Sequence, residues 1–146
     1  MVTKTLARGG VERAMQMPCP PLPGATGDTE TNLAIKAQTT LAFLQTHDFV
    51  ALHVGGPDEA THRQDPVEKA AFIARADKEM LAPILAECPA GTRVLLTCDH
   101  AALCSTAGHT TEPVRALLWQ KGTILSGDKG LLSGRKAIPP LMGNAP

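Results

Sequence analysis

The sequence predicts an α/β fold in which helices pack against a small sheet, and three observations support this. Two long stretches carry apolar residues at helical spacing, and three short apolar runs at 48–54, 93–98 and 114–119 have the length of strands. Clusters of proline and glycine separate them. Because the order strand, long helix, strand is typical of a right-handed crossover, we expect the first two strands to be parallel. These elements are too few for a complete doubly wound domain, so we expect a partial one.

The chain has 146 residues and a mass of 15.3 kDa, which fits one domain or part of one. We divide residues 1–146 into a lead-in with a Pro/Gly-rich loop (1–27), an α/β body (28–126) and an irregular tail (127–146). Fourteen basic side chains balance fourteen acidic ones, which argues against nucleic-acid binding through bulk positive charge and against a polybasic membrane surface. Since the sequence contains neither a membrane-length apolar run nor a signal-peptide pattern, we expect a cytoplasmic protein.

The first part of the body predicts one amphipathic helix. Residues 18–27 contain four prolines and two glycines, which exclude a helix or central strand there. The spacing of Gly24 and Gly27 could suit a phosphate cradle, but the full Walker pattern is missing and a shaped loop is the preferred interpretation. Asp28 or Thr29 is the expected cap of a helix that runs to about residue 46. Its expected apolar stripe is Leu33, Ala37, Leu41 and Leu44.

The second helix has a strong start signal. Asp65 is the expected N-cap, Pro66 suits the first helical position, and Glu68 could close a capping box. Pro83 is expected to kink or end the helix because proline lacks the backbone N–H. The expected buried face consists of Ala70, Ile73, Ala74, Leu81, Ile84 and Leu85.

The four cysteines do not form a recognisable framework. Cys19, Cys88, Cys98 and Cys104 include no C-x-x-C pair, so a structural zinc site has little support. In the absence of a secretory signal we expect all four to be reduced thiols.

Candidate metal ligands follow the ends of the first two predicted strands. Asp58 and His62 are four residues apart and would share one side of a helical turn. Asp99 and His100 follow the second strand directly, and His109 lies in the next loop. Loops at the carboxyl ends of parallel strands converge on one edge of a sheet. Mixed carboxylate and imidazole ligands suit Zn²⁺, Mn²⁺ or Fe better than Ca²⁺. Ordinary turn, capping or surface roles remain the alternative for each residue.

The ordered motifs resemble one enzyme family. Pro-Gly-Ala-Thr-Gly-Asp at 23–28 with Thr-Asn at 31–32, the segment 48–62 with its Pro-Asp-Glu-Ala-x-His string, and the later Asp99-His100 and His109-Thr110 occur in this order. Together they resemble the archaeal-type cofactor-independent (2,3-bisphosphoglycerate-independent) phosphoglycerate mutases of the alkaline phosphatase superfamily. The resemblance runs from about residue 6 to residue 142 and concerns the C-terminal portion of these enzymes.

The resemblance implies a fold and a metal site. The family fold is a three-layer α/β/α alkaline phosphatase-like domain interrupted by an inserted domain, of which this chain would form the part after the insertion. Family members bind two divalent ions, and Mn, Zn, Mg and Fe all stay open here. By position, Asp58, His62 and His109 match the ligands of one ion, while Asp99 and His100 match ligands of the other.

The resemblance also implies a reaction, and it indicates which catalytic residues of the family have no counterpart in this sequence. Family members are isomerases (intramolecular phosphotransferases) that interconvert 3-phosphoglycerate and 2-phosphoglycerate through a phosphoserine. The family's N-terminal aspartate, nucleophilic serine and inserted domain have no counterpart here, since Ser105, Ser126 and Ser133 do not stand at the nucleophile's place. Gly55 stands where relatives often have an acidic residue. We therefore expect no catalytic nucleophile and negligible turnover from the isolated chain.

Two alternatives stay open beside the mutase. The chain could belong to a phosphatase or phosphonopyruvate decarboxylase-related metalloenzyme acting on another phosphorylated small molecule. It could also be a non-catalytic remnant, or a subunit that pairs with a separate N-terminal half. In that case we expect exposed sheet edges and self-association.

Overall fold

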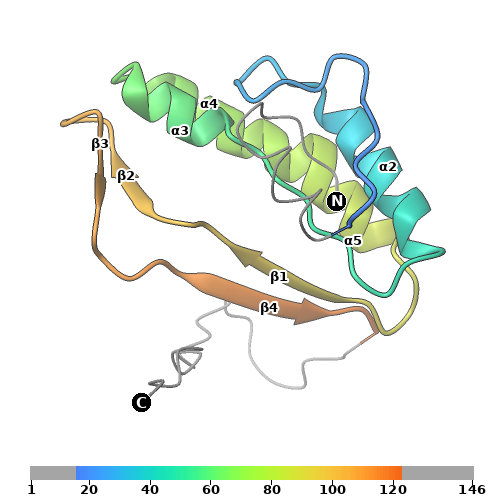
Figure 1. Ribbon diagram of the computed structural model, residues 1–146. Helices are drawn as coiled ribbons and strands as arrows, with labels where there is room; N and C mark the ends of the chain where they lie inside the picture. The colour runs from blue at the N-terminus through green and yellow to red at the C-terminus, as the bar shows by residue number, and fades with distance from the viewer. Residues whose placement is uncertain (1–15, 123–146) are drawn as a thin grey trace.

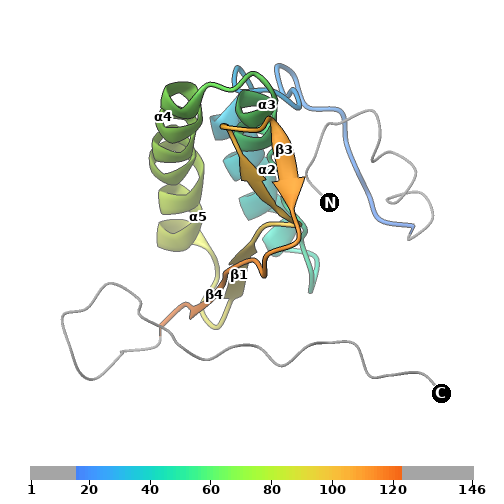
Figure 2. The same ribbon diagram turned by 90° about the vertical axis from the view of Figure 1, so that its left-hand side faces the viewer.

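The computed structural model describes residues 16–122, and its helices group on one side of a long strand ribbon (Figure 1). The helical side contains α2 (Leu33–Leu44), α3 (Gly56–His62), α4 (Pro66–Ala76), the π-helical turn η1 (Asp77–Leu81) and α5 (Ala82–Glu87). The ribbon contains β1 (Arg93–Thr97), β2 (Ala101–Leu103), β3 (Gly108–Thr110) and β4 (Ala116–Gln120). The view turned by 90° shows β2 and β3 beside α3 (Figure 2). The expected lead-in before residue 16 and the tail at 127–146 lie outside the described residues.

Helix α2 begins later than the sequence predicted. Its N-cap is Asn32, whose side-chain oxygen accepts from the backbone N–H of Ile35 at 3.0 Å. The prediction of Asp28 or Thr29 as the cap was wrong because these residues form a turn instead, in which the N–H of Thr31 donates to the carbonyl of Asp28. Gly24 adopts a left-handed φ of +69° in the preceding loop, a conformation that favours glycine.

The second helical stretch forms one rod with a π turn inside it. Asp65 caps the rod as expected, accepting from the N–H groups of Val67 and Glu68. The capping box is not formed, because the carboxylate of Glu68 binds Thr29 and Arg63 rather than returning to Asp65. Pro83 follows the π turn and stands in the first turn of α5. The helix does not end at Pro83, because the rod continues to Glu87, and the irregularity nearest to Pro83 is the π turn that precedes it.

The predicted buried face of this rod is confirmed at Ile84 and wrong at Ile73, and the π turn explains the difference. The buried residues of the rod are Phe72, Met80 and Ile84, whereas Ile73 is 51% exposed. In a regular α-helix, residues twelve apart drift by about 120° around the axis. The extra residue of a π turn removes about 100° of that drift, so Ile84 returns above Phe72. A regular 3.6-residue period cannot predict this face.

The core lies between α2 and the rod. Leu33 and Ala37 of α2 pack with Phe72, Met80 and Ile84, and Leu41, Leu52, Val54 and Ala76 surround them. Lys36, which the sequence did not indicate as a core residue, is 1% exposed on the same helix. Its ammonium donates to the carbonyls of Thr26 and His53 at 3.4 and 3.0 Å, and burial lowers the pKa of this lysine. Lys36 therefore ties the Pro/Gly-rich loop to the segment that leads into α3.

The strands form antiparallel pairs in the described part of the chain. β1 pairs with β4 and β2 pairs with β3, so the chain runs out through β1 and β2 and returns through β3 and β4 (Figure 1). The run at 93–98 forms β1 as expected, and the run at 114–119 corresponds to β4. The first expected strand, 48–54, contributes a single bridge residue, Leu52, in place of a strand. The expected parallel pairing of these two strands is not present among residues 16–122, because 48–54 does not form a strand and β1 pairs antiparallel with β4.

Two further observations concern the whole described region. No disulfide bond joins the four cysteines, all of which lie within residues 16–122. Within residues 16–122, every helix is too short or too polar to cross a membrane.

The loop at 24–29 approaches the start of α3 without room for a side chain. A Cβ atom added to Gly55 would lie 2.5 Å from the carbonyl oxygen of Gly27. Backbone atoms at this distance cannot move aside as the end of a flexible side chain could. Glycine at position 55 thus lets the loop and α3 lie together.

We expect Gly55→Ala to destabilise the protein by about 1–3 kcal/mol, the usual result of forcing an extra methyl group into a packed site. Urea unfolding followed by circular dichroism measures this change. Gly108→Ala is the control, because its Cβ would lie 3.5 Å from Thr106 Oγ1 in ordinary contact. Equal unfolding free energies for Gly55→Ala and the unmodified protein would contradict the close approach.

Candidate metal centre

Helix α3 carries two of the candidate ligands on one side. Pro57 stands in its first turn, where the missing N–H is harmless, and Asp58 and His62 follow with the i, i+4 spacing. Gly56 at the start of the helix faces the ring of Phe72, and a Cβ there would lie 2.7 Å from ring carbons. The buried ring of Phe72 therefore fixes where α3 begins, and with it the position of Asp58.

The tip of the strand ribbon supplies the third candidate ligand. His109 lies on β3, directly across from Ala102 of β2. Between the two strands, Ala107 adopts φ +52°, which is uncommon for a residue with a Cβ atom. The carbonyl oxygen of Ala107 lies 3.0 Å from Nδ1 of His62. The turn therefore contacts the ligand-bearing helix while β3 brings His109 toward it.

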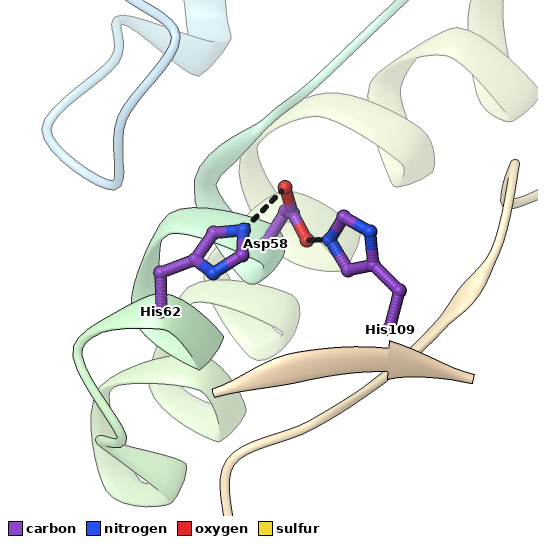
Figure 3. A group of neighbouring side chains, drawn as sticks. All are labelled: Asp58, His62 and His109. Carbon is purple, nitrogen blue, oxygen red and sulfur yellow. Dashed lines mark hydrogen bonds and ion pairs between the residues drawn. The ribbon is translucent and has the colours of Figure 1, made fainter. Parts of the chain in front are cut away.

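The three side chains converge on one point, as Figure 3 shows. Nε2 of His109 lies 3.1 Å from Oδ1 of Asp58, and Nε2 of His62 lies 3.4 Å from Oδ2 of the same carboxylate. One ligand atom from each residue lies within 4.8 Å of the others. Two ligands of a tetrahedral ion with 2.1 Å bonds are ~3.4 Å apart, so these spacings suit a shared ion. The side chains are 37–45% exposed and are accessible to an ion from solvent.

The hydrogen bond that His62 makes with Ala107 is compatible with a cation at its second ring nitrogen. A carbonyl oxygen only accepts hydrogen bonds, so Nδ1 of His62 must donate to Ala107. In the neutral ring, Nε2 then presents its lone pair toward a carboxylate oxygen of Asp58, which also carries lone pairs. A proton or a metal ion between them removes this conflict. An imidazole held by a backbone carbonyl through its second nitrogen is the usual arrangement of a metal-ligating histidine.

The second predicted pair, Asp99 and His100, lies beside this cluster. The ring of His100 stacks on that of His109 with centroids 3.7 Å apart, and Oδ1 of Asp99 lies 3.7 Å from Nε2 of His100. Within the described residues, the group with metal-ligand geometry contains Asp58, His62 and His109 but neither Asp99 nor His100. Nδ1 of His100 is buried without a hydrogen-bond partner among residues 16–122.

A charged clamp beside the site was not predicted from the sequence. Arg63, the residue after His62, donates two hydrogen bonds to Asp28 at 2.8 and 3.1 Å and two to Glu68 at 2.9 and 3.0 Å. The hydroxyl of Thr29 donates to Glu68 at 2.6 Å. The clamp joins the Pro/Gly-rich loop, the end of α3 and the start of α4. No spacing signal could find it, because its partners are 35 and 5 residues from Arg63.

The clamp shifts the ionisation of its three charged members. Hydrogen bonds from Arg63 lower the pKa of Asp28 below its ordinary value of 3.8, with further help from the N–H of Thr29. Hydrogen bonds from Arg63 and then Thr29 lower the pKa of Glu68 below its ordinary value of 4.5. The two carboxylates in turn raise the pKa of Arg63. Both carboxylates therefore favour the ionised form in the folded protein.

The sequence pattern of the Metalloenzyme superfamily matches residues 2–135, so the chain belongs to this superfamily. Within it, the chain is 39% identical over 109 residues to the 2,3-bisphosphoglycerate-independent phosphoglycerate mutase of Methanosphaerula palustris, a match covering 75% of this chain and 26% of that protein. It is 32% identical over 146 residues to the enzyme of the same name from Pyrococcus abyssi, covering 91% of this chain and 35% of that protein. The chain thus spans about a quarter to a third of these curated relatives, in their C-terminal portion.

A solved structure supports the fold. The PH0037 protein from Pyrococcus horikoshii matches with a TM-score of 0.76 and 33% identity, covering 83% of this chain and 37% of that protein. Together with the superfamily match, this confirms the predicted fold class, a partial alkaline phosphatase-like α/β domain. The predicted resemblance to archaeal cofactor-independent phosphoglycerate mutases is confirmed as well.

The Arg63 clamp predicts that part of the stability of the folded protein is lost at acidic pH. Since the pKa values of Asp28 and Glu68 are lowered by folding, their contribution is complete above their ordinary values and disappears as the pH falls through the folded values. We expect Arg63→Gln to melt at a lower temperature than the unmodified protein at about pH 6. This difference in melting temperature, the gap, should close by about pH 2.

Thermal unfolding by circular dichroism across this range measures the gap. Arg115→Gln removes an exposed arginine outside the clamp and serves as the charge control. A gap for Arg63→Gln that stays constant down to the lowest pH would contradict the assigned role of the two carboxylates.

Proposed function

We propose that this chain is the metal-holding C-terminal part of a phosphoglycerate mutase-like metalloenzyme that interconverts 3-phosphoglycerate and 2-phosphoglycerate. Membership of the Metalloenzyme superfamily and the mutase names of the relatives support this proposal. Because the chain spans a fraction of those relatives, the activity is proposed for the complete enzyme. The chain contributes ligands and no assigned nucleophile, so we expect negligible mutase turnover from it alone.

The observation that carries the proposal is the convergence of Asp58, His62 and His109. One carboxylate lies between two imidazoles from separate elements, with ligand atoms within 4.8 Å of one another. We propose that these three side chains hold one divalent ion and that Asp99 and His100 contribute to a second. A bound divalent ion would supply positive charge that polarises a phosphoryl oxygen. The protein residues fix the ligand geometry, through the Ala107 contact to His62 and the docking of β3 beside α3.

The donor set limits the choice of ion. Two imidazole nitrogens and one carboxylate suit Zn²⁺, Mn²⁺ or Fe²⁺, whereas Mg²⁺ and Ca²⁺ prefer oxygen ligands. The substrate class follows from the relatives, and we propose a small phosphorylated metabolite. A phosphatase or a phosphonopyruvate decarboxylase-related activity would use the same ligands. Assaying the full-length gene product against a panel of phosphorylated substrates distinguishes these reactions.

Metal titration tests the ligand assignment. We expect Zn²⁺ and Mn²⁺ to bind with one tight site per chain in isothermal titration calorimetry. Asp58→Ala, His62→Ala and His109→Ala should each lower the affinity by at least about 100-fold, because each removes a direct ligand rather than an outer partner.

His47→Ala is the matched control, since His47 is an exposed histidine at the end of α2. Its affinity should equal that of the unmodified protein. Unchanged binding in all three ligand variants would show that the ion, if bound, lies elsewhere.

A second candidate function is that of a subunit that associates with another polypeptide. Exposed leucines on β1 and β4 support it. Leu95 of β1 and Leu118 of β4 lie directly across from each other and are 55% and 62% exposed. Leu96 is also 48% exposed on this two-stranded ribbon. Exposed apolar pairs on a narrow sheet favour association with another chain.

For this candidate we expect the isolated chain to form dimers or larger species in size-exclusion chromatography with light scattering. The double variant Leu95→Lys, Leu118→Lys should shift the population toward monomer, because it places charge on the exposed apolar pair. Val67→Lys is the control for an exposed apolar residue on the helical side. A monomeric unmodified chain at high concentration would contradict the expected self-association.

A further inference from the structure

The candidate metal centre is assembled from two bodies with few described links between them. Asp58 and His62 belong to α3, while His109 belongs to the ribbon tip formed by β2, β3 and the turn at 104–107 (Figure 3). Figures 1 and 2 both show this tip lying against α3 at the far end of the ribbon from the β1–β4 base. The distance across the cluster therefore depends on what holds the tip to the helices.

Lys69 on α4 makes the required link. Its ammonium donates to the hydroxyl of Thr61 at 2.8 Å and to the carbonyl of Ala102 at 2.8 Å. Thr61 is the residue before His62 and is fully buried at the end of α3. Ala102 lies directly across from His109 in the β2–β3 register. A single side chain thus touches the immediate neighbour of one ligand and the strand partner of another.

We propose that Lys69 is a positioning residue that sets the separation of His109 from Asp58 and His62. This inference rests on the proposed metal-binding function and deepens it. Lys69 does not touch the ligands, and it acts through Thr61 and Ala102. Three other bonds within residues 16–122 cross the same boundary: His62 with Ala107, His109 with Asp58, and a 3.9 Å contact from Cys104 Sγ to the hydroxyl of Thr61. The first two involve candidate ligands and the third is a weak sulfur donor at long range. Substituting Lys69 therefore removes the two short bonds that link the two sides of the boundary without involving a proposed ligand.

A second lysine provides a matched comparison at the opposite end of the ribbon. The ammonium of Lys121, just after β4, donates to the carbonyls of Leu85 and Ala86 at 3.0 and 2.6 Å. These carbonyls belong to the C-terminal end of α5, where a cation is favourable. Both lysines join the ribbon to a helix through carbonyl oxygens, but only Lys69 does so next to the cluster.

The test compares Lys69→Met, Lys121→Met and Lys78→Met, the last a change at an exposed lysine of the π turn. Methionine keeps the chain length and removes the ammonium. In Lys69→Met we expect the Zn²⁺ affinity to fall by about 10–100-fold, the usual effect of losing an outer partner of a metal ligand. The Zn²⁺ affinities of Lys121→Met and Lys78→Met should both stay within about twofold of the unmodified protein, a difference of about 0.4 kcal/mol.

Amide hydrogen exchange on the metal-free protein gives a readout that does not need the ion. Lys69→Met should lose protection at 101–110 while α2 keeps its protection, whereas Lys121→Met should lose protection at 93–97 and 116–120. Unchanged exchange at 101–110 together with unchanged Zn²⁺ affinity would overturn the role of Lys69 and leave the proposed function standing. If the unmodified protein binds no Zn²⁺, the proposed function fails, and with it the positioning role. Loss of protection throughout the helices of Lys69→Met would indicate a general structural role and would also overturn the proposal.

If Lys69→Met does not fold, the same measurements are made on Lys69→Gln. Its shorter amide side chain cannot reach both the hydroxyl of Thr61 and the carbonyl of Ala102. The expected and contradicting results are the same for that variant.

Discussion

The contact between Asp58 and His109 is the interaction on which the site depends. It joins residues 51 positions apart in the sequence and brings the tip of the strand ribbon against α3. Without it, Asp58 and His62 would form an ordinary i, i+4 pair on a short helix, with no third ligand. The carboxylate faces the Nε2 atoms of both His62 and His109, as the proposed three-ligand set requires. The carbonyl of Ala107 lies 3.0 Å from Nδ1, the other ring nitrogen of His62.

The surrounding structure holds the two sides of this contact by polar links more than by apolar packing. The main core lies between α2 and the rod of α4, η1 and α5, and its members do not include residues of the ribbon. Buried Lys36 and the Arg63 clamp fix the Pro/Gly-rich loop against the segments on either side of α3. Hydrogen bonds from lysines to backbone carbonyls join the ribbon to the helices at both ends. Such links are directional, so they define a geometry where a flat apolar contact would permit sliding.

Local signals predicted part of the secondary structure, and tertiary contacts decided the rest. Asp65 and Pro66 marked the start of α4 because capping chemistry is local, and the four-residue spacing of Asp58 and His62 placed them together for the same reason. The sequence could not show that β1 pairs with β4, since an apolar run is compatible with either strand direction. Nor could it place His109 against Asp58, or His100 stacked on His109, because both contacts depend on the ribbon folding back. Resemblance to a family supplied the grouping that spacing alone left open.

A crystal structure of the chain soaked in Zn²⁺, with anomalous data collected at the zinc edge, tests the central claim most directly. The account predicts one strong anomalous peak bonded to a carboxylate oxygen of Asp58 and to Nε2 of His62 and of His109 at about 2.0–2.2 Å. A structure in which zinc occupies another place, or in which these three side chains point into separate regions, would contradict it.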